Sequence, residues 1–209
     1  MYMMMGPAGM VHLIGNPELR PEESVSWDLG LETEFGRGYA ALTYFDNDVK
    51  NLIDARFEGW DGDTRQYRYV NVGQARIRGL ETTLGWHLGD RGEAKLISTW
   101  MDAEDTVSHT RLPQRPSFSQ VWQLSYDDHK DNGWSAMLWD QLYLDYVTEG
   151  FVPGSSAETT SYNVLNVTVA RKLSRNSRIY GSIRNLLDRQ DERCDLEGRF
   201  WSVGVSHSF

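Results

Sequence analysis

Apolar and polar side chains alternate along much of this chain with a period of two residues. At the C-terminal end Trp201, Val203, Val205 and Phe209 fall on one face, interrupted by His207, while serine and glycine occupy the other. Side chains of a β-strand point to opposite faces in turn, so this pattern predicts a strand with one apolar and one polar face. Enrichment in β-branched and aromatic residues extends the prediction to nine strands. They cover residues 24–34, 39–57, 67–88, 92–104, 115–127, 133–147, 160–172, 176–187 and 198–209.

The connections between these strands alternate in length. Short connections at 35–38, 88–92, 127–133 and 174–177 contain the Gly, Asn, Asp and Ser residues that tolerate tight turns. Longer polar segments separate them, at 58–66, 105–114, 148–159 and 188–197. Short turns at one rim and long loops at the other are typical of an outer-membrane β-barrel, whose apolar side chains face lipid. The fold class predicted is therefore all-β, an antiparallel transmembrane β-barrel.

The number of predicted strands indicates that the barrel is partial. Single-chain bacterial barrels usually have an even number of strands and both ends in the periplasm. If the short turns are periplasmic, the first and the ninth strand both descend, and the chain starts outside the cell. We therefore expect residues 1–23 to form an irregular extracellular segment and residues 24–209 to form part of a barrel.

Composition agrees with strands that cross a membrane. Hydrophobic residues make up 40% of the chain, with 8 Trp, 10 Tyr and 7 Phe, and the mean hydropathy is -0.54. A membrane-spanning strand needs about 9–11 residues with every second one apolar, so a low average hydropathy is compatible with a barrel. The net charge of -9 argues against a nucleic-acid partner. The N-terminus lacks the basic start and apolar core of a signal peptide, as we expect for part of a barrel.

Catalytic and metal-binding patterns are missing from the sequence. The five histidines form no His-x-x-His or Glu-x-x-His pair, and Cys194 is the single cysteine. The acidic pairs Asp46/Asp48 and Asp61/Asp63 do not complete a twelve-residue calcium loop. Without a Gly-x-Ser-x-Gly elbow or an assignable base, the sequence predicts no enzyme, no cofactor and no metal site.

Ligand capture is the better functional hypothesis. The predicted long loops and adjoining strand ends carry aromatic and cationic side chains that stack on planar rings and attract anions. The candidates for contact with such a planar, anionic ligand are Trp60, Arg65, Tyr67, Arg111 and Tyr146. Tyrosine and tryptophan also populate membrane interfaces, and that structural role is the alternative for these residues.

Five motifs, in order, resemble the last barrel strands of TonB-dependent outer-membrane receptors, closest to the ferric-enterobactin and colicin I receptors. They are Gly15–Glu22 (GNPELRPE), Tyr69–Glu81 (YVNVGQARIRGLE), Leu112–Pro116, Arg184–Asp188 and Gly198–Phe200. The resemblance covers residues 15–209 and implies about nine C-terminal strands of a 22-stranded barrel in the bacterial outer membrane. Physically, prolines and glycines in these motifs first suggest structural roles. Gly73 and Gly79 within one predicted strand, for example, indicate a bulge or a close backbone approach.

The resemblance also implies a function and partners. It implies uptake of a ferric siderophore or a similar ligand, with TonB acting through an N-terminal plug that this chain lacks. Outer-membrane lipid would surround the barrel, and the fragment alone would not transport. Phe209, with Trp201 in the same strand, resembles the C-terminal signal that the barrel assembly machinery reads. Two alternatives are a small adhesin-like or structural outer-membrane barrel and a soluble all-β binding module.

Overall fold

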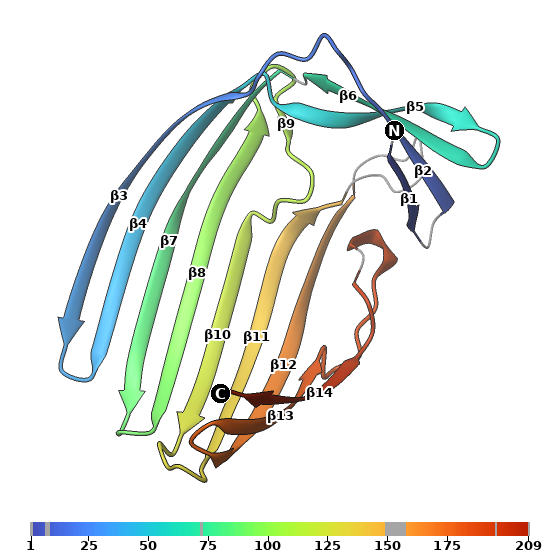
Figure 1. Ribbon diagram of the computed structural model, residues 1–209. Coiled ribbons are helices and arrows are strands. Elements are labelled where there is room, and N and C mark those ends of the chain that lie inside the picture. Colours follow the sequence, from blue (N-terminus) through green and yellow to red (C-terminus); the bar gives the residue numbers. More distant parts are fainter. Residues whose placement is uncertain (1, 7–8, 72, 149–157, 195, 209) are drawn as a thin grey trace.

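The computed structural model describes residues 2–6, 9–71, 73–148, 158–194 and 196–208, which form two β-sheets (Figure 1). The larger sheet runs in the order β14-β13-β12-β11-β10-β8-β7-β4-β3, with the short β9 paired to β8. We call this nine-strand path the wall; its neighbours are all antiparallel. The smaller sheet runs β1-β2-β6-β5, with β2 and β6 parallel. No helix among the described residues is long and apolar enough to cross a membrane.

The wall strands agree closely with the predicted segments. They are β3 (Glu23–Phe35), β4 (Gly38–Lys50), β7 (Gln74–Leu88), β8 (Gly92–Asp105), β10 (Phe118–Asp127), β11 (Trp134–Val147), β12 (Thr159–Ser174), β13 (Ser177–Arg184) and β14 (Phe200–His207), with β9 at Thr110–Arg111. The other elements are β1 (Tyr2–Gly6), β2 (Gly9–Ile14), β5 (Ile53–Asp61), β6 (Thr64–Asn71) and the 3-10 turn η1 (Glu192–Cys194). The all-β antiparallel fold class is confirmed.

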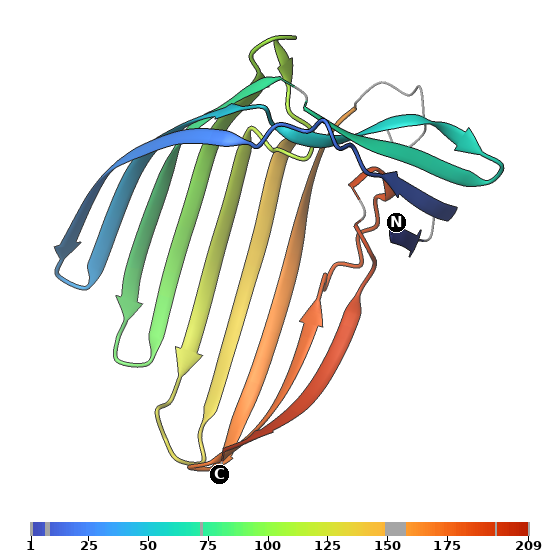
Figure 2. The same cartoon turned by 45° about the horizontal axis from the view of Figure 1, so that its top comes forward.

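The alternation of short turns and long connections is also confirmed. Figures 1 and 2 show the tight turns β3–β4, β7–β8, β10–β11 and β12–β13 together at one end of a curved wall. The opposite end carries the β5–β6 hairpin, the β8–β10 connection and the segment between β13 and β14. We call these the short-turn end and the long-loop end.

Two predicted strands were too long. Residues 39–57 divide into β4 and β5, and residues 67–88 divide into β6 and β7. The breaks lie side by side, because Lys50 pairs with Gln74, and Asn51 and Gly73 beyond them have φ angles of 55° and 103°. A left-handed residue ends regular strand geometry, so both strands leave the wall here and continue as a separate hairpin. Gly73 therefore ends a strand and does not mark a bulge within one.

The predicted irregular segment 1–23 is also partly regular. Residues 2–6 and 9–14 form the β1–β2 hairpin, and β2 lies parallel to β6 with Leu13 opposite Tyr67. The local propensities of residues 1–23 do not reveal this pairing, because the partner strand β6 comes from residues 64–71, far along the chain.

One face of the wall is apolar and uncovered. Leu31 is 71% exposed and Val203 80%, whereas the buried hydrophobic residues among those described are Ala75, Ala103, Val147 and Ala170. A water-soluble domain with large apolar side chains outside and a few small ones inside would lose the hydrophobic contribution to folding. The face therefore needs an apolar medium.

Aromatic side chains form two rows on this apolar face. Near the short turns lie Phe35, Trp86, Tyr126 and Trp134, and nearer the long loops lie Trp27, Tyr44, Trp100 and Phe118. The rows are eight residues apart on β3 and on β10, about 27 Å along a strand at roughly 3.4 Å per residue. For strands tilted by about 40° this is ~21 Å along the membrane normal, close to the apolar band of outer-membrane barrels.

On β4, β7 and β8, charged side chains begin directly beyond the second aromatic row. On β11, Asp140 lies on the same face within the band, opposite Trp122, where it is 7% exposed and accepts a hydrogen bond from Asn163 at 2.8 Å. Asp46, Arg78 and Asp102 are opposite one another on β4, β7 and β8, one step past Tyr44 and Trp100. The Arg76 guanidinium donates to both carboxylate oxygens of Asp46, at 3.1 and 2.6 Å, and Arg78 donates to Asp102 at 2.9 Å. Paired charges of this kind belong in water or head groups, so they place the boundary of the apolar band at this row.

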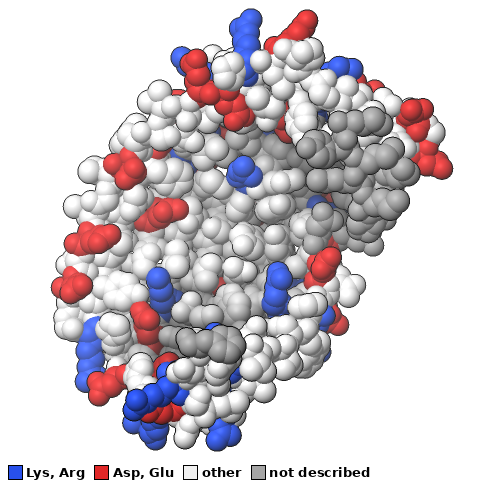
Figure 3. All heavy atoms as spheres, in the orientation of Figure 1, with Lys and Arg blue, Asp and Glu red and all other residues white. Residues whose placement is uncertain are grey.

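The other face of the wall is polar, and aromatic rings there lie across glycines of the next strand. The register pairs are Tyr39–Gly85, Phe45–Gly79 and Tyr180–Gly204, and a Cβ at each glycine would overlap the opposing ring. The prediction of a close approach at Gly79 is therefore confirmed. Figure 3 shows this face hollowed, with acidic side chains along the β3 edge.

Candidate ligand-binding site

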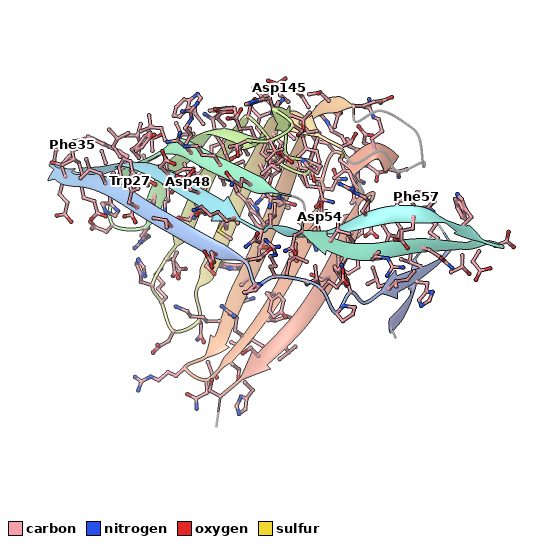
Figure 4. The ribbon with its side chains drawn as sticks, turned by 90° about the horizontal axis from the view of Figure 1, so that it is seen from above. Trp27, Phe35, Asp48, Asp54, Phe57 and Asp145 are labelled. Carbon is pink, nitrogen blue, oxygen red and sulfur yellow. The ribbon has the colours of Figure 1, made fainter. Side chains whose placement is uncertain are left out.

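The β5–β6 hairpin lies at the long-loop end and is fixed at its base by side-chain hydrogen bonds. Asn71 donates to the carbonyls of Arg20 and Asn51, at 3.0 and 2.7 Å, and accepts from the Arg20 amide at 2.9 Å. Glu22 accepts from the Ile53 amide at 2.6 Å. From above, the hairpin with Asp54 and Phe57 extends away from the end of β3 at Phe35 (Figure 4).

Three predicted ligand residues come together on this hairpin. Trp60 pairs in register with Arg65, whose guanidinium carbon lies 5.3 Å from the tryptophan ring centroid. Phe57 joins them to Tyr67, with ring centroids 6.2 Å from Trp60 and 5.5 Å from Tyr67. A break in register between Phe57 and Gly59 places Trp60 on the same face as Phe57. We call these four residues the hairpin cluster; Trp60 is 52% exposed.

The other two candidates lie elsewhere. Arg111 is on β9 and donates from Nη2 to the Asp145 carbonyl at 3.0 Å. Tyr146, the residue after Asp145, packs edge-to-face on Tyr162 of β12, with ring centroids 5.8 Å apart. Arg111 therefore contacts β11, Tyr146 is part of that strand, and neither belongs to the hairpin cluster.

A pocket that the sequence did not reveal lies on the polar face near Tyr146. Its cavity volume is about 560 Å³. Side chains of β11 to β14 and of the 185–199 loop line it, among them Trp139, Tyr143, Tyr162, Arg184, Cys194, Glu197 and Phe200. We call this the polar-face pocket. Trp139, Tyr143 and Tyr162 hold positions that in a barrel wall face the lumen, and large aromatic residues at those positions are the sequence signal that could have found it.

Hydrogen bonds hold the 185–199 loop against β12 beside this pocket. Asn185 is 3% exposed, and its side-chain amide donates to the carbonyls of Arg189 and Glu197 at 2.6 and 2.8 Å. Its backbone N–H donates to the side-chain oxygen of Asn166 at 3.1 Å. Thr160 donates to Asp191 at 3.1 Å. These bonds give Asn185 a structural role, and the loop is a fixed part of the pocket.

Asp191 should make the loop sensitive to acid. The Arg193 side chain donates to its carboxylate at 2.9 and 2.7 Å, and with the Thr160 hydroxyl it lowers the pKa of Asp191 to about 2. A lowered folded-state pKa stabilises the loop above the ordinary carboxyl pKa, and this is lost as pH falls through 2. We expect pepsin to cleave within residues 185–199 increasingly from pH 4 to pH 2. Asp191→Asn should give rapid cleavage already at pH 4, whereas Asp131→Asn at the short-turn end should not.

The strand that carries the proposed assembly signal is present as β14. Trp201 is 63% exposed on the apolar face, in line with Val203 and Val205. Phe209 lies outside the described residues. Their role as a signal for the assembly machinery stays a prediction.

An open antiparallel wall with an apolar outer band, two aromatic rows, short turns at one end and long loops at the other defines an outer-membrane β-barrel protein. The family model "TonB dependent receptor-like, beta-barrel" matches residues 2–186. The chain belongs to this family, whose members lie in the bacterial outer membrane and are transporters, not enzymes.

Solved structures show the same fold. The ferric enterobactin receptor PfeA of Pseudomonas aeruginosa is 24% identical over 96% of this chain, with a TM-score of 0.68. The siderophore receptor PirA of Pseudomonas aeruginosa is 25% identical over 99%, with a TM-score of 0.63, and the copper transporter OprC is 21% identical over 92%, with a TM-score of 0.70. The chain covers 33% of each, so it spans about a third of their length.

Proposed function

We propose that this chain is the ligand-facing part of a receptor for a ferric siderophore, energised through TonB by a plug that other residues supply. The observation that carries the proposal is the hairpin cluster. Arg65 over the Trp60 ring, with Phe57 and Tyr67 beside it, combines a fixed cation with aromatic faces. An iron chelate with planar, anionic catecholate arms offers matching chemistry.

The base of the hairpin supports binding by preorganisation. Asn71 and Glu22 fix the hairpin to the segment before β3, so the cluster loses little freedom when a ligand docks. The opposite face of the hairpin carries Arg56 and Arg68, of which Arg68 forms an ion pair with Glu58, and it has no aromatic ring among the residues that the structure describes. The aromatic face is therefore the better surface for a planar chelate.

Substitution of the hairpin cluster tests this function. In the natural gene product that contains this chain, Trp60→Leu with Arg65→Gln should weaken binding of ferric enterobactin, used as the probe, by about ten- to a hundredfold. Titration of the receptor in detergent and growth of an iron-limited strain would measure the loss. Trp86→Leu, on the apolar face at the short-turn end, is the matched control and should bind normally.

The same titration separates iron chelates from copper. The likeness to OprC rests on fold, and the proposal predicts that the receptor binds the ferric chelate and not Cu²⁺. Binding of Cu²⁺ that survives the double substitution, without binding of any ferric chelate, would contradict it. Binding of neither would favour an adhesin-like role.

A further inference from the structure

We propose that the polar-face pocket is a second binding subsite, for a hydroxylated aromatic acid: a flat ring bearing an anionic oxygen and a phenolic hydroxyl. The inference rests on the proposed function, because it assigns the pocket to a ring of the same class of ligand. Its volume of about 560 Å³ is within the range of small-molecule sites. The evidence lies in the polar groups that line it.

Arg184 supplies a cation for the acid. It lines the pocket from the end of β13, opposite Phe200, and forms no ion pair within the part of the chain that the structure describes. A guanidinium presents a planar fork of donors that matches a carboxylate with two parallel hydrogen bonds. The neighbouring Arg193, in contrast, already donates to Asp191.

Tyrosine hydroxyls and one carboxylate serve the phenolic end. Tyr143 and Tyr162 pack with ring centroids 5.1 Å apart, and neither hydroxyl hydrogen-bonds to another described residue. Glu197 also lines the pocket, and its carboxylate forms no hydrogen bond or ion pair with another described residue, so it can accept from a phenol. Positive and negative groups in one pocket favour a ligand with both an acid and a hydroxyl over a simple anion.

Aromatic walls favour a flat ring. Tyr146, Tyr162 and Tyr143 make a continuous series of ring contacts, and Trp139 and Phe200 line the same pocket. A planar ring that stacks on such faces gains contact at low entropic cost, because the walls are already fixed. The loop above is fixed too, through Asn185 and Asp191.

Cys194 is a native reporter of occupancy. It lines the pocket and is half-buried, so a bound ring would shield its thiol from alkylation. The probe is 2,3-dihydroxybenzoate, added to the natural gene product in detergent. At ten times its Kd the probe should slow carbamidomethylation of the Cys194 peptide about tenfold, measured by mass spectrometry. Cyclohexanecarboxylate, an acid without a flat ring, should not.

Variants of the pocket residues test whether the probe protects Cys194 by binding in the pocket or by an effect elsewhere. Arg184→Gln should raise the Kd of the probe about ten- to a hundredfold, and Tyr162→Leu should raise it also. Arg184→Lys, which keeps the charge but not the two parallel hydrogen bonds, should restore only part of the protection. Each variant must alkylate at the wild-type rate without probe, which shows that the pocket is intact.

The hairpin variants separate this proposal from the first. Trp60→Leu with Arg65→Gln should leave protection of Cys194 unchanged, even where ferric enterobactin binding is lost. If the probe protects Cys194 in the wild-type receptor but the receptor binds no ferric enterobactin, the siderophore function is contradicted and the subsite is supported. Absence of protection, or equal protection in Arg184→Gln, would overturn the subsite whatever the receptor transports.

Discussion

Leu84→Arg is expected to prevent most of the chain from assembling into a bilayer. Leu84 lies on the apolar face of β7, between the two aromatic rows, and is 50% exposed. A cationic side chain facing lipid near the midplane of an outer-membrane barrel costs about 2–4 kcal/mol. The measurement is urea unfolding in lipid vesicles, with the folded form followed by its heat-modifiable migration.

Thr83→Arg is the matched control, because Thr83 lies at the same depth on the polar face. It lines a hollow with Glu32 and Glu34, so an arginine there meets carboxylates and water. We expect this variant to fold within about 0.5 kcal/mol of the wild type, as substitutions away from special features do. Equal losses from both variants would mean that the apolar face does not meet lipid.

The sequence predicts the wall because its signal is local. Alternation with a period of two places each side chain on a face without knowledge of the neighbouring strand, and tight turns carry their own residues. This is why each end of β3, β8 and β11 lies within one residue of the predicted end. The apolar face follows from the same alternation.

The β5–β6 hairpin cannot be predicted in this way, because it depends on how β4 and β7 pair with each other. Asn51 and Gly73 each permit a break, but the breaks matter because β4 and β7 pair so that both fall at the same height. Within each strand alone, the alternation of apolar and polar residues continues through both breaks, so the sequence predicts two uninterrupted strands. The sequence predicts Trp60 and Arg65 as loop residues, and their mutual contact follows only from the register of β5 and β6.

The polar-face pocket is non-local in a stronger sense. Trp139, Tyr162 and Arg184 come from three successive strands, and their juxtaposition needs two registers to be known together. Glu197 and Cys194 are added by a loop whose position depends on Asn185 and Asp191. The side-chain types at these positions are compatible with stacking and charge, but the pairing of strands decides which groups share one cavity.

Gly85→Val should be the second large effect, and it acts on the polar face. The Tyr39 ring lies across Gly85 and its hydroxyl donates to Glu93 on the following strand at 2.7 Å. A Cβ at position 85 would overlap that ring, so Tyr39 must move and lose the bond to Glu93. Overpacking of this kind costs about 1–3 kcal/mol, and urea unfolding in vesicles would measure it.

Gly181→Val is the control for the loss of a strand glycine as such. A Cβ there would meet the Ser202 carbonyl at an ordinary 3.9 Å, on the apolar face, so the substitution should be neutral or stabilising. Tyr39→Ala in the Gly85→Val background should recover part of the loss, because the added side chain then fills the space that the ring vacates. A double-mutant cycle isolates this coupling. Simple additivity of the two changes would show that the ring does not depend on Gly85, and that glycines on the polar face were kept for another reason.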